Sequence, residues 1–130
     1  MVASIAFGGD HEAAMNFGLV ERVPKPWGHE LIFARAKKYV GKILVIEKGH
    51  RLSLQFHRRK HESLMVLRGR LKLVLGKKTK TVGPGATFTI PPKTIHRFEA
   101  ARGRVTLIEV STPELWDVVR VQDDYGRRGK

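Results

Sequence analysis

Gln55-Phe-His-Arg-Arg-Lys-His-Glu62 is the stretch that decides the fold, together with a single His96 that follows two prolines. Gln55 and His57 are two residues apart, so on a strand their side chains leave the same face of the sheet. Glu62 comes five residues after His57, far enough to lie on the next strand after a short bend. Two imidazoles, a carboxylate and an amide oxygen are ligands that a borderline divalent metal accepts. The spacing predicts a metal site inside a small β-barrel.

His61 is the competing ligand, because it is the direct neighbour of Glu62. On an extended chain two adjacent side chains point to opposite faces. Only one of the two can therefore reach the metal, and a small shift of the bend would exchange them.

Short apolar or alternating segments separated by glycine and proline turns run outward from this stretch in both directions. Such strands, with few helical segments between them, are typical of a sandwich or barrel. A turn is expected at Pro24–Gly28, because two prolines disfavour a central strand. One helical turn is expected after Ser111. The predicted strands are residues 29–34, 39–47, 53–57, 62–68, 71–75, 78–82, 87–90, 95–100 and 104–110.

The length of 130 residues indicates one domain. We expect a barrel over residues 21–130, preceded by an N-terminal arm over residues 1–20 and ending in a frayed basic tail. The absence of cysteine excludes disulfides and thiolate metal sites. The first residues make a poor signal peptide, and no apolar run approaches the ~18 residues that span a bilayer. A soluble, cytoplasmic protein with no membrane partner is expected.

The chain is strongly basic, with 25 Lys and Arg against 12 Asp and Glu and a formal net charge of +13. Such an excess can indicate nucleic-acid binding. In Arg68–Leu75, however, basic and apolar residues alternate, as on the outer face of an antiparallel sheet. Aromatic residues are not interleaved with the basic runs as stacking platforms would be. A solvated exterior is favoured over a nucleic-acid surface, and attraction of anionic substrates such as sugar phosphates is compatible with it.

Two glycine-bounded motifs carry a family resemblance. Gly49-x5-Gln55-x-His57-x4-Glu62-x6-Gly69 resembles the first cupin motif, and Gly85-x5-Pro91-x4-His96 resembles the second. Within the cupins, the chain is most similar to the C-terminal isomerase domain of type II phosphomannose isomerases and its stand-alone relatives. The supporting strings are Lys25-Pro-Trp-Gly28, Leu52-Ser-Leu-Gln-Phe-His57, Ile90-Pro-Pro92, His96-Arg97 and Asp123-Asp-Tyr-Gly-Arg127.

The resemblance implies a single-domain, all-β, antiparallel jelly-roll barrel with one divalent transition metal. Zinc is the first expectation, with manganese, iron, cobalt and nickel as the others. The implied metal ligands are Gln55, His57, Glu62 and His96. The family's usual glycine in the second motif is Lys93 here, and its closing asparagine is Ala100.

The implied activity is the interconversion of an aldose and a ketose that each carry a phosphate, with mannose 6-phosphate as the expected aldose. Glu62 is the candidate base that moves the proton between adjacent carbons. Lys93 is the candidate proton donor or phosphate ligand, because it lies near the barrel mouth in this pattern. The other candidate phosphate ligands are Arg51, Arg97 and Arg127. Arg51 shares the strand parity of Gln55 and faces inward if the strand begins that early.

Other interpretations stay open from the sequence alone. A metal-dependent dioxygenase would use the same two histidines and carboxylate, and an apolar barrel interior would favour it. A non-catalytic module that binds a sugar or effector, or a degenerate cupin without metal, would keep the same fold. A homodimer is expected, because free strand edges in a barrel of this size commonly pair.

Overall fold

The structure, a computed structural model, describes residues 17–127. Most of the predicted N-terminal arm and the last three residues therefore lie outside the described residues. The described chain forms eleven strands and no helix, and every strand pairing is antiparallel. The prediction of an all-β jelly roll is confirmed.

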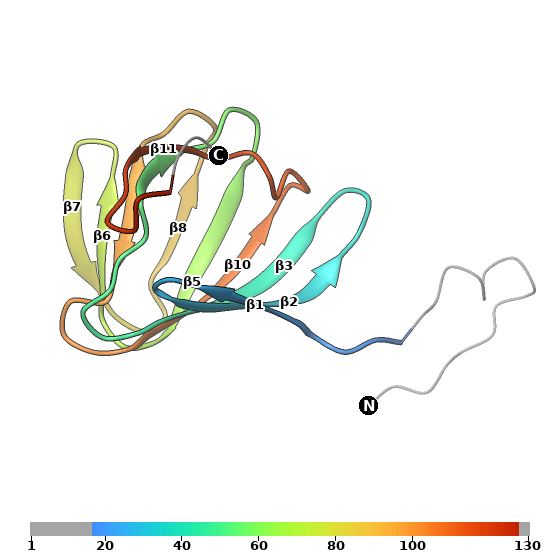
Figure 1. The fold of residues 1–130 in the computed structure, drawn as a ribbon, viewed down its shortest axis with the longest axis horizontal. Helices are drawn as coiled ribbons and strands as arrows, with labels where there is room; N and C mark the ends of the chain where they lie inside the picture. Colours follow the sequence, from blue (N-terminus) through green and yellow to red (C-terminus); the bar gives the residue numbers. More distant parts are fainter. Residues whose placement is uncertain (1–16, 128–130) are drawn as a thin grey trace, which may run out of the picture.

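Two sheets make up the barrel, and Figure 1 shows them on the two sides of the molecule, with β6 and β7 at the left and β2 and β3 at the right. The larger sheet has the order β1 (Glu21–Lys25), β2 (Gly28–Arg35), β3 (Val40–Ile46), β10 (Val105–Ser111), β5 (Glu62–Arg68) and β8 (Thr87–Ile90). The smaller sheet has the order β11 (Val119–Gln122), β4 (Leu54–Phe56), β9 (His96–Glu99), β6 (Leu71–Leu75) and β7 (Lys78–Val82).

Alternation of side chains along the strands builds the core. On β5 the buried residues are Glu62, Leu64 and Val66, whereas Met65 and Leu67 face outward. This period of two is what a strand with one buried face requires. The same parity on neighbouring strands brings together the apolar core residues Trp27, Leu44, Ile46, Leu52, Leu64, Val66, Leu71, Leu73, Ile90, Phe98, Ala100, Val105 and Leu107.

The inner face of the larger sheet changes character along its strands. On β10, Val105 and Leu107 belong to the apolar core, but Glu109 of the same inward row is also buried. Lys42 of β3 lies directly opposite Glu109 in the ladder and is buried as well. Buried charges are rare in proteins unless they are paired. One end of the barrel is therefore a packed core, and the other end is a polar interior.

Two strands that the sequence did not predict lie at sheet edges. β1 contains Pro24 and runs to Lys25, so the expected turn is shorter and covers Pro26 and Trp27. An edge strand tolerates proline, because the nitrogen that cannot donate faces away from the ladder. β11 pairs with β4 at one edge of the smaller sheet. The segment after Ser111 forms turns instead of the expected helical turn.

The basic residues of β6 and β7 are exposed, as the sequence predicts for this part of the smaller sheet. Lys72 of β6 and Lys78 and Lys80 of β7 are exposed. Among the described residues, no helix exists that is long and apolar enough to span a membrane.

Candidate metal centre

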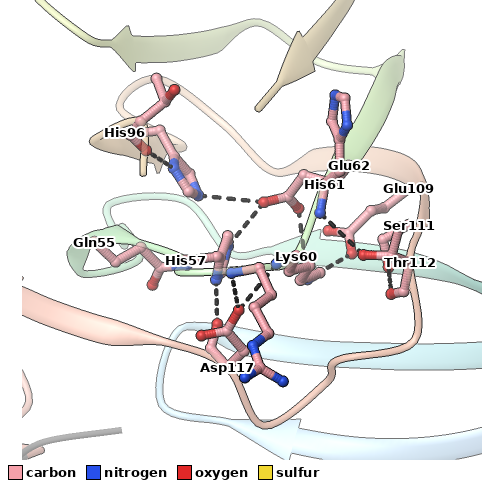
Figure 2. Close-up of polar contacts among 12 residues, drawn as sticks. Gln55, His57, Lys60, His61, Glu62, His96, Glu109, Ser111, Thr112 and Asp117 are labelled. Atoms are coloured by element: carbon pink, nitrogen blue, oxygen red, sulfur yellow. Dashed lines mark hydrogen bonds and ion pairs between the residues drawn. The ribbon is translucent and has the colours of Figure 1, made fainter. Parts of the chain in front are cut away.

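Three strands of the barrel bring His57, Glu62 and His96 together. His57 follows the last residue of β4, Glu62 is the first residue of β5, and His96 is the first residue of β9. Figure 2 shows the three side chains pointing toward one another in the barrel interior, and all three are buried. Each has one donor atom within 4.8 Å of the donor atoms of the other two.

The donor atoms lie at separations typical of ligands that share one ion. Nε2 of His57 is 2.8 Å from Oε2 of Glu62, and Nε2 of His96 is 3.5 Å from the same oxygen. Two ligands that each bind a metal at about 2.1 Å lie roughly 3.0–3.5 Å apart. The observed separations are close to this range.

Both imidazoles are oriented by backbone carbonyls. Nδ1 of His57 donates to the carbonyl oxygen of Asp117 at 2.5 Å, and Nδ1 of His96 donates to that of Thr94 at 2.9 Å. These bonds require a proton on Nδ1, so in the neutral form each ring directs an Nε2 lone pair at the cluster. Metal-binding histidines are commonly held in this way by their second nitrogen.

The three converging atoms, Nε2 of His57, Oε2 of Glu62 and Nε2 of His96, are buried and have no hydrogen-bond partner within residues 17–127. Buried polar atoms without partners are uncommon and cost free energy. A cation bound to all three would satisfy them at once. The donor set therefore fits a divalent metal, and this His-Glu-His group is able to hold one.

The charge states of the cluster also suit a metal. Burial would raise the pKa of Glu62, but a hydrogen bond from His57 in its protonated form and the charge of Lys60 outweigh it and hold the pKa below its ordinary value. Burial lowers the pKa of His96. Near neutral pH the cluster thus offers a carboxylate and a neutral imidazole, the forms that bind metals.

A chain of alternating buried charges leads from the cluster across the larger sheet. Lys60 Nζ lies 3.6 Å from Glu62 and 3.0 Å from Glu109, and Lys42 Nζ lies 3.8 Å from Glu109 and 3.0 Å from Glu30. Burial opposes the charge of Lys60, but Glu109 and Glu62 raise its pKa above the ordinary value. Burial raises the pKa of Glu109. We call Glu30, Lys42, Glu109, Lys60 and Glu62 the buried charge chain.

Asp117 anchors the bend between His57 and Glu62, a role that sequence reasoning missed. Its carboxylate accepts hydrogen bonds from the backbone N–H groups of Arg58, Arg59 and Lys60, at 3.1, 2.6 and 2.9 Å (Figure 2). These donors outweigh the effect of burial and lower the pKa of Asp117. No local pattern marks this residue, because it lies 57 to 59 positions from its partners.

The structure separates the other predicted ligands from the cluster to different degrees. Gln55 lies directly opposite His96 in the ladder, but its Oε1 accepts a hydrogen bond from Ser53 Oγ at 2.5 Å. His61 is exposed, and its backbone N–H donates to Thr112 Oγ1. At the bend it is thus Glu62, not His61, that points inward (Figure 2).

A cavity of about 260 Å³ adjoins the cluster and is lined by both polar and apolar side chains. His57 and Gln55 reach it from the smaller sheet, whereas Glu62 and His96 are not on its wall. Among the described residues, its wall contains one acidic residue, Glu30, and a large excess of cations. These cations are Lys25, Arg35, Lys42, Lys60, Arg120 and Arg127.

Of the four cations predicted to bind phosphate, only Arg127 lines this cavity. Arg51 was expected to face inward only if its strand began before it, but β4 begins at Leu54. The Arg51 guanidinium pairs with Asp124 instead. Arg97 is buried against the Leu52 carbonyl and Gln122. Lys93 donates its backbone N–H to the His57 carbonyl at 2.6 Å, while its side chain is exposed. Lys25 and Arg120, which the sequence did not single out, stand on the wall.

A protein-family model matches most of the chain. The family described as mannose-6-phosphate isomerase C-terminal matches residues 12–123. Among curated proteins, mannose-1-phosphate guanylyltransferase ManC of Salmonella typhimurium is 30% identical over 131 aligned positions, covering 98% of this chain and 26% of that protein. Alginate biosynthesis protein AlgA of Pseudomonas aeruginosa is 30% identical over 110, covering 81% of this chain and 23% of that protein. The chain thus spans about a quarter of these relatives.

Solved structures share the fold at lower identity. An RmlC-like cupin from Shewanella frigidimarina has a TM-score of 0.69 at 19% identity, over 77% of this chain and 90% of that one. Streptomyces Pac13 with uridine has a TM-score of 0.69 at 20% identity, over 84% of this chain and 93% of that one. At this identity the likeness establishes the cupin fold alone.

Proposed function

Because the chain belongs to the mannose-6-phosphate isomerase C-terminal family, we propose that it interconverts an aldose and a ketose that carry a phosphate. The reaction would take place beside one divalent metal ion held by His57, Glu62 and His96, with zinc as the first expectation. The observation that carries this proposal is the convergence of three unpartnered donor atoms next to a cavity rich in cations.

Moving a proton between two adjacent carbons creates negative charge on the neighbouring oxygens. When bound, a divalent metal polarises such oxygens and stabilises that charge. Lys60 lines the same cavity and keeps its proton, because its pKa is raised by Glu109 and Glu62. It is therefore suited to donate a hydrogen bond to a developing oxyanion and not to act as the base.

The two carboxylates near the cavity are suited to different tasks. Glu62, the base expected from the sequence, has a lowered pKa and directs one oxygen at both histidines, so it is a weak base and a good metal ligand. Glu30 is the acidic residue on the cavity wall, and it accepts a hydrogen bond from Lys42 at 3.0 Å. We therefore assign the proton transfer to Glu30.

The composition of the cavity favours an anionic substrate over an apolar one. A dioxygenase that uses the same donor set was expected to have an apolar interior, whereas this wall carries six basic residues. Its volume of about 260 Å³ is slightly below the usual range of ligand pockets, about 300–1,000 Å³, which favours a compact ligand such as a sugar phosphate. The second candidate is a module that binds such a ligand without turnover. The names of the relatives favour it, since ManC is a guanylyltransferase and the chain covers a quarter of it.

The decisive experiment is an isomerase assay on protein loaded in turn with Zn, Mn, Co and Ni. We expect mannose 6-phosphate and fructose 6-phosphate to be interconverted with at least one metal. Glu30→Gln should lower kcat by about 10²-fold or more with little change in metal content, as for loss of a general base. Binding of both sugars without turnover, with every metal, would overturn the isomerase and leave the binding module.

We also propose that the chain forms a homodimer in the cytoplasm. Strands β1 and β8 end the larger sheet, and β7 and β11 end the smaller one, so each edge offers unpaired backbone groups. Light scattering at micromolar concentration tests the assembly, and the mass of a single chain would contradict it.

A further inference from the structure

One row of side chains runs across the smaller sheet from the metal cluster. Gln55 of β4 is the ladder partner of His96 on one side and of Arg120 of β11 on the other. Directly opposed residues in an antiparallel sheet project from the same face. Adjacent strands lie about 4.8 Å apart, so the Arg120 backbone is roughly 10 Å from that of His96. The row therefore joins the candidate metal centre to a cation at the sheet edge.

Arg120 makes no ion pair with any residue from 17 to 127. It lines the cavity wall, and its Nε atom is buried with no hydrogen-bond partner in the part of the chain that the structure describes. A buried donor of a charged group that lacks an acceptor costs free energy. An anion in the cavity would supply that acceptor.

Lys25 and Arg127 bring two more positive charges to the same cavity. Arg127 is held in place by Asp123, whose carboxylate oxygens accept from Nε at 3.0 Å and from Nη2 at 2.8 Å. Lys25, from the last position of β1, has no ion pair within residues 17–127.

The positive charges of Lys25, Arg120 and Arg127 repel one another, and the pKa values show it. Burial lowers the pKa of Lys25, and Arg127 and Arg120 are among the charges that lower it further, against the opposing effect of Glu30. Burial also lowers the pKa of Arg120, and the charge of Arg127 lowers it further. Repulsion of this kind is relieved when a dianion binds between the cations.

Like Arg127, the other three cations of the cavity wall have acidic partners. Lys42 pairs with Glu30, Lys60 with Glu109, and Arg35 with Glu21 at the exposed rim. Arg127 shares its charge with Asp123, so the wall cations that make no ion pair within the described residues are Lys25 of β1 and Arg120 of β11.

We propose that Lys25, Arg120 and Arg127 form the subsite for a phosphate monoester, which holds the substrate with its reacting carbons toward His57 and His96. Gln55 stands between the two ends of the substrate. The identity of the ligand rests on the proposed function, but the subsite itself requires only an anion.

The test is calorimetric titration of inorganic phosphate into metal-free protein, which reports on the subsite without any turnover. Charge-assisted hydrogen bonds are the strong ones, so Arg120→Gln and Lys25→Gln should each weaken phosphate binding by about tenfold or more. Lys80→Gln removes a charge from the exposed face of β7 and should leave binding unchanged. Arg120→Lys keeps the charge and should restore part of the affinity.

The outcomes separate this inference from the isomerase proposal. If Arg120→Gln and Lys25→Gln both bind phosphate as tightly as the unmodified protein, the subsite is overturned, even when the protein isomerises sugar phosphates. If both variants lose phosphate binding while no sugar phosphate is turned over, the subsite stands and the isomerase fails. Should Arg120→Gln fail to fold, judged by circular dichroism, Lys25→Gln alone decides.

Discussion

His57 Nε2 faces Glu62 Oε2 at 2.8 Å, although Nδ1 of the same ring already donates to the Asp117 carbonyl. A neutral imidazole that donates from Nδ1 presents a lone pair at Nε2. Two lone pairs at this separation repel unless a proton or a metal ion lies between them. This contact is therefore where protons and a divalent ion compete.

Metal binding should release protons and tighten as the pH rises. The histidines bind metal in the neutral form, so a protonated histidine must first lose its proton. Below the pKa of such a group, the apparent metal affinity therefore falls roughly tenfold for each pH unit. Burial lowers the pKa of His96, so protonation of His96 should weaken metal binding only at a pH below the ordinary histidine range. Titration of zinc in two buffers of different ionisation enthalpy measures the proton release, and equal heats in both would contradict the competition.

His57→Ala and His96→Ala should each lose metal while the barrel stays folded, because the apolar core lies at the other end of the sheets. Elemental analysis should fall from about one ion per chain toward zero, while circular dichroism still shows the β-sheet signal. The matched control is His61→Ala, which removes an exposed imidazole from the same bend. If His61→Ala loses the metal and His57→Ala keeps it, the ligand assignment fails.

Asp117→Asn should weaken both stability and metal affinity, because three backbone N–H groups lose a charged acceptor. The expected loss in the free energy of unfolding is about 1.5–3 kcal/mol, and metal affinity should fall by about 10–100-fold. Urea denaturation and zinc titration measure the two effects. Asp124→Asn, at the exposed pair with Arg51, is the control and should leave both quantities unchanged.

Asp123→Asn should reduce the loss of stability in acid. The hydrogen bonds with Arg127 lower the pKa of Asp123 to about 2, from an ordinary value of 3.8. A carboxyl with a depressed pKa in the folded state stabilises the fold above its unfolded pKa, and this contribution disappears as the pH falls toward 2. Between pH 5 and pH 2 the unmodified protein should thus lose more stability than the variant. Parallel urea curves at each pH test this, and identical losses would contradict it.

Lys93→Gly should stabilise the fold. Lys93 has a φ of 68°, the left-handed region that costs a non-glycine residue about 1–2 kcal/mol. Glycine avoids this strain but loses more backbone entropy, so the net gain should be up to about 1 kcal/mol. Thermal unfolding measures it, with Lys48→Gly, at an exposed turn position without positive φ, as the control that should not gain stability.

Lys93→Ala separates the backbone role of this residue from a role in binding. The side chain is exposed and does not line the cavity, so the KM for a phosphorylated sugar should stay unchanged. The position of Lys93 in the second motif, near the expected barrel mouth, predicts instead that it binds the phosphate and that KM rises. A rise in KM for the phosphorylated sugar only would favour the sequence-based interpretation.

The local sequence predicted most strands, and it predicted that His57 and Glu62 lie close together, for a physical reason. The period of two and the glycine and proline turns are local signals, and the positions of His57 and Glu62 follow from strand parity. β1 was missed because Pro24 suggested a turn, and β11 because four residues at a sheet edge show little periodicity.

The residues that the sequence did not reveal are those whose meaning depends on distant contacts. Lys25 and Arg120 lie on the two missed strands and meet only when both sheets have closed. Asp117 reaches its partners across 57 or more positions. Charge and residue type were visible in each case, but their convergence is a property of the tertiary fold.

Because of the buried charge chain, a single substitution in this part of the interior should strongly destabilise the fold. Each of its lysines neutralises carboxylates on both sides, so loss of Lys60 alone would leave Glu109 and Glu62 without their shared partner. Removing one member of such a set costs far more than replacing a matched pair with apolar residues. Any redesign of this cavity, or any natural divergence of it, would have to change a lysine and a glutamate together.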